Sequence, residues 1–383
     1  RHGVMHNNVR MTWGKAFAKW IKDPETAMNT SLEFNDRYAL DGRDPNSIAG
    51  VMWCFGLFDR PFSPFDLVMG NVRKRNTDTH QSRLDLQKYR NWTEKPTMEN
   101  KMKIGIIGGG ISGSFAAMLL KKLGHEVTIW DKGRGASGRL SAKKVTSNFS
   151  IQVGSRSLDN LPSWLERYVA EWIRLELVKL DGNSLTPIRP LSDIIKHLNK
   201  EVEVNYRCKV ISLEEGNESA EIAVEKENSI IKYQYDRVIV ALPIEQAIDV
   251  CRPLELKIDG KSDSCWVVWG PDNKNIQIPN EWEAYRHSNG SEILEIRIEN
   301  DNLFDRNKTD SETVIDLVTD ELGIDSINWR AHFWKYAKSV KGPGERIHTG
   351  RVTIIGDGFG LPIGTVGGAL ESSGRAVSEI HLR

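Results

Sequence analysis

The chain has 383 residues, with 52 lysines and arginines against 52 aspartates and glutamates, so its formal net charge is zero. Such a chain has no overall charge to draw it to nucleic acid or to an anionic membrane, although a local basic face is compatible with these totals. Its length predicts two or three domains with an ample core, and its 39% hydrophobic content excludes a disordered chain.

The four cysteines are widely separated and form no CxxC pair: Cys54, Cys208, Cys251 and Cys265. This spacing indicates neither a zinc site nor a disulfide framework, so we expect no metal and predict reduced thiols in a cytoplasmic protein. No apolar run approaches the length of a membrane span and no signal peptide is apparent, so no membrane partner is expected. The sequence opens at Arg1 within a running pattern, which predicts the C-terminal piece of a longer protein.

The first 90 residues are predicted to be largely helical. Apolar residues recur at helical spacing through Met11–Trp20 and through Ala27–Leu40. Asp23 followed by Pro24 starts the second of these helices, with proline in its first turn. We therefore expect an all-α segment over residues 1–90.

A turn-rich stretch follows the second predicted helix. Asn46 and Ser47 can cap a third helix that runs through Trp53. The polar run Lys74–Arg83 is expected to be loop, and its basic residues lack interleaved aromatic residues, so a solvated face is favoured over DNA binding. Residues 91–102 are predicted to be a linker between domains.

From Lys103 the hydrophobic pattern changes from helical to strand period. Buried strands typical of a nucleotide-binding domain are predicted at Lys103–Ile107, Val127–Asp131, Arg237–Ala241 and Arg351–Ile355. Strands of antiparallel type are predicted at Val202–Leu213, Ser219–Val224, Trp266–Trp269, Glu292–Ile298 and Ala331–Trp334. A helix over Leu370–Ile380 is expected to close the chain.

This alternation predicts an α/β fold with a split domain. A Rossmann-like FAD-binding domain would comprise residues 103–160 and 345–383. An inserted antiparallel-sheet substrate domain would comprise residues 161–344, with a strand at 237–243 that belongs to the nucleotide-binding sheet.

A glycine pattern marks the first corner of this domain. Gly108, Gly110 and Gly113 form GxGxxG directly after a predicted strand and before a predicted helix, Ser114–Leu123. The first glycine allows a tight turn, the second lets a pyrophosphate approach the backbone, and the third lets helix and strand pack closely. Asp131 ends the next strand about 20 residues on, where the fingerprint requires an acid for ribose hydroxyls. The sequence therefore predicts a dinucleotide site.

Two further motifs distinguish FAD from NAD. Arg134, Gly138 and Arg139 lie in a second glycine-rich loop, and the arginines can neutralise phosphate charge. At the far end of the chain Asp357 follows a buried strand, beside Gly356, and can bind ribityl hydroxyls. Gly367 then lies in the small-residue start of a helix whose N–H groups would face the flavin. Two such corners at opposite ends of one domain indicate one long ligand, FAD.

Residues 103–383 resemble the renalase-like branch of the flavin-containing amine oxidoreductases, through GGGISG, WDKGRGASGR, DRVIVALP, HFWKYA and IIGDGFG. The resemblance implies non-covalent FAD and oxidation of a small-molecule substrate, a reduced nicotinamide (NADH or NADPH) or an amine, by hydride transfer to flavin N5. The chain departs from the pattern in two places. Gln152–Ser155 stands where the branch has Asp-x-Gly-Ala, and the expected floor of the substrate pocket, Arg156–Arg189, is short.

These departures leave the catalytic residues open. His332 and Trp334 are candidates, on a predicted strand that faces the flavin-binding domain. The alternatives are a packed or surface role for His332, which we favour, and a core role for Trp334 and Tyr336. A flavin-binding protein without turnover is therefore an alternative to the oxidoreductase.

Residues 1–90 resemble the end of the FAD-binding helical domain of class II DNA photolyases and cryptochromes, through RHGVMHNNVRMTWGKAFAKW and LEFNDRYALDGRDPNSIAGVMWCFGLFDRPF. The resemblance assigns a flavin pocket to four residues: Asn7, Arg10, Asn35 and Asp41. It assigns electron transfer to Trp13 and Trp20, which lie two helical turns apart and for which core packing is the alternative. DNA repair or light sensing, with DNA as a partner, would require the missing part of this module upstream.

Overall fold

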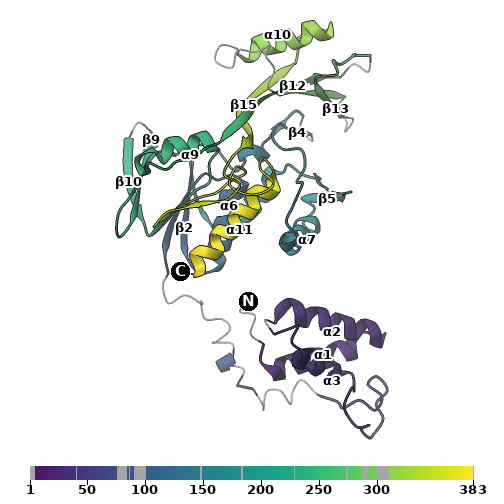
Figure 1. Cartoon of the computed structure of the whole chain (residues 1–383). Helices are drawn as coiled ribbons and strands as arrows, with labels where there is room; N and C mark the ends of the chain where they lie inside the picture. The colour runs from purple at the N-terminus through teal and green to yellow at the C-terminus, as the bar shows by residue number, and fades with distance from the viewer. Residues whose placement is uncertain are drawn as a thin grey trace. The chain divides into compact units, whose positions relative to one another are not determined.

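The structure is a computed structural model that describes residues 5–39, 41–75, 84–85, 87–89, 101–146, 149–182, 184–227, 229–272, 275–287, 292–299 and 310–382. It divides the chain into a helical unit, Arg1–Thr97, and an α/β unit, Met98–Arg383 (Figure 1). Leu40, most of the Lys74–Arg83 run and residues 91–100 of the predicted linker lie outside the described residues.

The helical unit contains the helices α1 Asn7–Trp20, α2 Pro24–Tyr38 and α3 Pro45–Cys54, and each pair of these is in contact. The side chain of Asp23 caps α2 by accepting from the Thr26 N–H at 2.7 Å, as the Asp-Pro pair predicts. The prediction that Asn46 or Ser47 caps α3 is wrong. Asp44 caps it, because Pro45 already occupies the first helical position.

Close packing between α1 and α3 depends on Gly14. A Cβ at this position would lie 2.6 Å from Cys54 Sγ, so we expect Gly14→Ala to cost about 1–3 kcal/mol of stability. Gly50, inside α3, has open space where its Cβ would stand. Gly50→Ala should therefore be neutral or stabilise the unit by up to about 1 kcal/mol. Calorimetry of the full chain measures both changes, and equal melting temperatures would contradict the packing argument.

The α/β unit is built on a six-stranded sheet in the order β16-β17-β11-β1-β2-β7. Its strands are β1 Lys103–Ile107, β2 Glu126–Asp131, β7 Glu203–Tyr206, β11 Arg237–Val240, β16 Ile347–His348 and β17 Val352–Ile354. The strands from β17 to β7 are parallel and only the edge strand β16 is antiparallel. This is the Rossmann-like order, which confirms the predicted fold class.

The prediction of one antiparallel strand over Val202–Leu213 is wrong. The first part, β7, pairs in parallel with β2 in the large sheet. The chain then turns at Arg207, whose φ is +58°, and continues as β8. Alternation of apolar residues predicts a half-buried strand, but it does not predict which strand it pairs with or whether the pairing is parallel.

The large sheet is covered on both faces. Helices α6 Ile111–Lys122 and α11 Val366–Leu382 lie side by side on one face and pack on Ile104, Ile106 and Ile129 (Figure 1). A three-stranded antiparallel sheet covers the other face, with strands β8 Lys209–Glu215, β9 Ala220–Lys226 and β10 Ser229–Tyr235. Burial on both faces explains why the parallel strands are continuous apolar runs.

The stretch that was expected to floor the substrate pocket lines a cavity only near its start, at Ser157, Asp159 and Asn160, and the rest of it packs elsewhere. It forms η2 Ser163–Leu165, α7 Glu166–Arg174, β5 Val178–Asp181 and β6 Ser184–Pro187, followed by α8 Ser192–Leu198. Trp172 and Tyr168 of α7 belong to one core cluster with Phe115 of α6 and Leu370 of α11. This stretch therefore supports the helices of the Rossmann-like part.

A second, four-stranded sheet forms the inserted part, in the order β13-β14-β12-β15. Its strands are β12 Lys261–Pro271, β13 Glu283–His287, β14 Ile293–Glu299 and β15 Arg330–Lys341. The structure confirms the sheet predicted from Trp266–Trp269, Glu292–Ile298 and Ala331–Trp334. Helix α10 Ser311–Leu322 packs on one face of this sheet, which leaves the other face for the site. The remaining elements are η1 Gly138–Leu140, β3 Ala142–Lys144, β4 Ser150–Gln152, α9 Ile244–Val250 and η3 Arg252–Leu254.

Candidate cofactor and substrate site

A cavity of about 1110 Å³ opens where the parallel strands of the large sheet end. Ile107, Asp131, Ala241 and Gly356, at or just beyond the ends of β1, β2, β11 and β17, all line it. Ligands of open α/β sheets bind at this edge. The volume slightly exceeds the range of about 300–1,000 Å³ for small-molecule pockets, so the cavity has room for a ligand as long as a dinucleotide.

The glycine turn after β1 forms one wall of the cavity. Gly108 has φ +103°, and a Cβ there would overlap the carbonyl oxygen of Ala241. A Cβ at Gly113 would overlap the carbonyl oxygen of Gly108, so this glycine lets α6 pack on the turn. Gly110 instead faces open space, with nothing within 4 Å of a Cβ, and α6 begins there without a side-chain cap. Its free N–H groups therefore suit an anion such as a pyrophosphate.

Asp131 is held at the end of β2 by two backbone donors. Its carboxylate accepts from the N–H of Gly109 and from the N–H of Gly133, each at 2.6 Å. The side chain is partly exposed and lines the cavity next to the glycine turn. An acid fixed at this point can accept from ribose hydroxyls.

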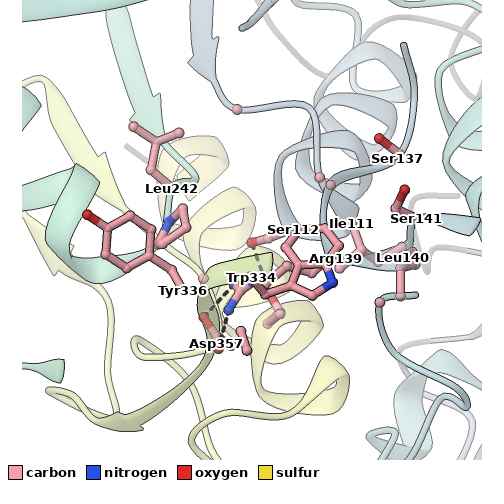
Figure 2. Close-up of a pocket in the computed structure, with 18 of the residues that line it drawn as sticks. Ile111, Ser112, Ser137, Arg139, Leu140, Ser141, Leu242, Trp334, Tyr336 and Asp357 are labelled. Atoms are coloured by element: carbon pink, nitrogen blue, oxygen red, sulfur yellow. Dashed lines mark hydrogen bonds and ion pairs between the residues drawn. The ribbon is translucent and has the colours of Figure 1, made fainter. Parts of the chain in front are cut away.

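Arg139 and Asp357 join the second glycine loop to the C-terminal motif. The guanidinium donates to both carboxylate oxygens at 2.7 Å (Figure 2). The Ser339 N–H donates to the same carboxylate at 2.9 Å. Burial disfavours the charged carboxylate, but the charge and hydrogen bonds of Arg139 outweigh it and hold the Asp357 pKa below its ordinary value. Sequence reasoning assigned both residues to the ligand, and the structure pairs them with each other.

The predicted cofactor residues divide into two groups. Those that line the cavity are Gly108, Gly110, Asp131, Gly138, Arg139, Gly356 and Asp357. Gly113, Arg134 and Gly367 are not among the lining residues. A Cβ at Gly367 would overlap the carbonyl oxygen of Asn160, so this glycine serves close packing at the start of α11.

The free face of the second sheet closes the cavity. The register places Arg297 of β14, Val267 of β12 and His332 of β15 side by side in one row. The next row holds Glu299, Cys265 and Trp334. Except for Val267, these side chains belong to residues that line the cavity, and we call the five lining residues the platform: Arg297, Glu299, Cys265, His332 and Trp334. The structure thus brings both candidate catalytic residues to the cavity.

The acidic and basic residues of the platform were missed from the sequence. Alternation along β14 places Glu295, Arg297 and Glu299 on one face, but an exposed face gives the same pattern. Glu295 is fully buried and accepts from Arg297 Nε at 2.9 Å, with His287 Nε2 at the same distance from its other oxygen. Arg297 also donates to the Gln152 carbonyl oxygen at 2.5 Å, which ties the platform to β4.

His332 is held next to a fixed aromatic ring. Its ring lies 4.7 Å from that of Trp334, edge to face, and Trp334 Nε1 donates to the Val153 carbonyl oxygen at 2.6 Å. Burial, and secondly the charge of Lys143, lower the His332 pKa below its ordinary value. The imidazole is therefore neutral at pH 7.

The titration of His332 tests directly whether burial and Lys143 lower the pKa of its imidazole. We expect its imidazole NMR signals to titrate below pH 6.5, and Lys143→Met to raise the midpoint only partly, because burial is the larger cause. Lys144→Met is the control, since Lys144 is the next residue of β3 and does not line the cavity. A midpoint at or above 6.5 in the unaltered protein would contradict the burial of this side chain.

In the helical unit the predicted flavin-pocket residues are largely engaged with the protein itself. Buried Asn35 donates through Nδ2 to the Gly42 carbonyl oxygen at 2.8 Å and to Ser47 Oγ at 3.0 Å. Buried Arg10 pairs with Asp41 at 2.5 Å, whereas Asn7 is exposed at the start of α1. These contacts fix the turn between α2 and α3.

Trp13 and Trp20 lie on one face of α1, as their spacing predicts. Their ring centroids are 6.0 Å apart, edge to face. Trp13 is 50% exposed and Trp20 is 63% exposed, so neither is a core residue of the helical unit as described. Their contact is compatible with electron exchange between the rings.

The four cysteines are buried free thiols. Burial raises the pKa of Cys265, on the platform, to about 11, so this thiol is protonated and unreactive at neutral pH. Within the described ranges no group of side chains is suited to hold a metal ion. No helix in the described part of the chain has the length and apolar character needed to cross a membrane.

Comparisons with known proteins support the fold of each unit. The NAD(P)-binding Rossmann-like domain family matches residues 106–172. A deoxyribodipyrimidine photo-lyase of Methanothermobacter thermautotrophicus is 41% identical over 87 residues, 23% of this chain and 19% of that protein. The 4-hydroxybenzoate brominase (decarboxylating) of Marinomonas mediterranea is 25% identical over 144 residues, 37% of this chain and 26% of that protein.

Among solved structures, CmlS, a flavin-dependent halogenase, superposes with a TM-score of 0.52 at 14% identity, over 74% of this chain and 58% of that one. This likeness concerns the fold. The chain spans only about a fifth to a quarter of the length of these two curated relatives.

Proposed function

We propose that the α/β unit binds FAD and acts as an FAD-dependent oxidoreductase. The carrying observation is that one continuous cavity is lined by the glycine turn, by the Arg139–Asp357 pair and by the platform. A site that served only a short nucleotide would need neither the C-terminal motif nor the second sheet. The match to a Rossmann-like family and the partial likeness to a brominase support this class.

Each part of the cavity has a separate task in this proposal. The N-terminus of α6 holds the pyrophosphate, and Asp131 accepts from the ribose next to the adenine. The Arg139–Asp357 pair lines the same cavity and would hold the chain that leads to the flavin ring. FAD supplies a hydride acceptor at N5. The platform then positions the substrate and keeps water from it.

Within this class we propose the renalase-like type, in which a reduced nicotinamide or an amine gives up a hydride. The order of motifs from GGGISG to IIGDGFG supports it. The lining favours the nicotinamide, because the cationic side chain of Lys143 repels a protonated amine.

The absorption spectrum of the purified full chain tests the proposal. We expect a bound flavin, released as FAD on denaturation, and anaerobic bleaching by NADH or NADPH. A protein that shows no flavin absorption after incubation with FAD would refute FAD binding. A flavin that neither nucleotide nor simple amines bleach would favour a binding protein without turnover.

A second candidate function concerns the helical unit. Its likeness to photolyases and the contact between Trp13 and Trp20 favour light-driven electron transfer to a flavin, in repair or light sensing. The chain spans a fifth of that photolyase, so this activity depends on further protein. Blue-light photoreduction of flavin added to the full chain, lost on Trp13→Phe and kept on Trp53→Phe, would support it.

A further inference from the structure

The substrate end of the cavity has a marked excess of positive charge. The charged side chains that the second sheet and β3 contribute to its lining are four cations and one acid: Lys143, Arg297, Lys335, Lys338 and Glu299. Two of the cations are neutralised, because Arg297 pairs with buried Glu295 and Lys338 pairs with Glu299 at 2.6 Å. Lys335 lies over the ring of Tyr336. Lys143 has no acidic partner in the described part of the chain.

Lys143 lines the same cavity as the planar rings of the platform. Its charge acts on the His332 imidazole. His332 and Trp334 meet edge to face, and the indole is fixed by its bond to the Val153 carbonyl oxygen. A rigid aromatic surface next to an unpaired ammonium group is suited to a ring with an anionic group attached.

We infer that the substrate is an anion with a planar ring, whose ring packs on His332 and Trp334 and whose anionic group pairs with Lys143. The inference rests on the proposed function and specifies its substrate class. The anionic group is either a carboxylate on the ring or the phosphate of a nucleotide. Both would meet the same ammonium group.

The FAD-loaded full chain tests this inference with two matched pairs of probes. Benzoate and benzamide differ in charge on the ring, and nicotinamide mononucleotide and nicotinamide riboside differ in the phosphate. We expect the charged member of at least one pair to perturb the flavin absorption spectrum with at least about tenfold lower Kd than its neutral partner. The pair that responds identifies the source of the anionic group.

Lys143→Met should remove this preference, whereas Lys144→Met should retain it, because Lys144 is equally exposed but does not line the cavity. A second readout is independent of flavin: the bound anion should raise the midpoint of the His332 NMR titration. Equal binding of charged and neutral probes, or equal losses in the two lysine variants, would overturn the inference. If the protein retains no FAD but the anion still shifts His332, the proposed function fails and the anion site stands.

Discussion

Replacing Asp357 with alanine is expected to destabilise the α/β unit by about 3–5 kcal/mol and to abolish retention of FAD. The carboxylate is 95% buried and is the partner of Arg139 in two hydrogen bonds of 2.7 Å. Its removal leaves the half-buried guanidinium of Arg139 without its counter-charge, which is more costly than the net value of the pair. It also frees the Ser339 N–H, through which Asp357 contacts β15.

Three variants separate charge from packing at this pair. Asp357→Asn keeps the shape and loses the charge, so it should be destabilised nearly as much. The double change Arg139→Met with Asp357→Leu should recover stability without recovering FAD, because it removes both charges of the pair. Lys232→Met is the control, since it breaks an exposed ion pair with Glu221 on β9 and should hardly alter the melting temperature. Similar melting temperatures for Asp357→Ala and Lys232→Met would contradict the argument.

The same pair gives a pH dependence with a defined sign. Because the Asp357 pKa is lowered in the folded protein, its contribution to stability is complete above the ordinary value near 3.9. The contribution is lost as the pH falls through the lower, folded value. We therefore expect the stability difference between the unaltered protein and Asp357→Asn to be constant at neutral pH and to shrink only in strong acid.

Replacing Gly113 with alanine is expected to give the second large effect, a loss of both folding stability and FAD. Its Cβ would overlap the Gly108 carbonyl oxygen and lie 3.1 Å from the Ala241 Cβ, so the backbone of α6 would have to move away from β1. Overpacking of this kind costs about 1–3 kcal/mol or more when only backbone can yield. The displaced helix would also carry the free N–H groups of its first turn away from the ligand.

Gly110→Ala separates folding from cofactor binding at the same turn. Nothing in the protein lies within 4 Å of its Cβ, so its melting temperature without FAD should be unchanged. The new methyl group would occupy the space where the pyrophosphate approaches the backbone, so the Kd for FAD should rise at least about tenfold. Calorimetry and flavin fluorescence measure the two effects. Normal FAD binding by the Gly110→Ala protein would show that the phosphates do not lie at this turn.

Local patterns sufficed wherever a short segment encodes its own geometry. GxGxxG between an apolar strand and a helix predicts the turn at Gly108, because glycine alone tolerates its φ of +103° and the close approach at Gly113. Asp23 before Pro24 predicts the start of α2 for a similarly local reason. The insertion of a separate sheet also follows from the change in hydrophobic period along the chain.

Contacts between distant residues were beyond such patterns. Arg139 and Asp357 are 218 residues apart, and each alone has the properties of a ligand contact, so their pairing was not foreseen. Lys143 and His332 were not connected either, because only the packing of the β3–β4 hairpin beside β15 brings the lysine charge within range of the imidazole. The strand over Glu203–Tyr206 joined the large sheet for the same reason, since pairing partners depend on the whole topology.

The sequence by itself determined that the chain has a helical unit and a Rossmann-like unit with a dinucleotide turn, because turns, caps and hydrophobic periods are properties of a few neighbouring residues. Only the tertiary structure decided which side chains share the cavity. Strand register placed Arg297, His332 and Trp334 on one platform, and folding brought Lys143, which has no acidic partner in the described part of the chain, into the same lining. Charge balance is a sum over residues that folding brings together, so the substrate end of the site could be inferred only from the fold.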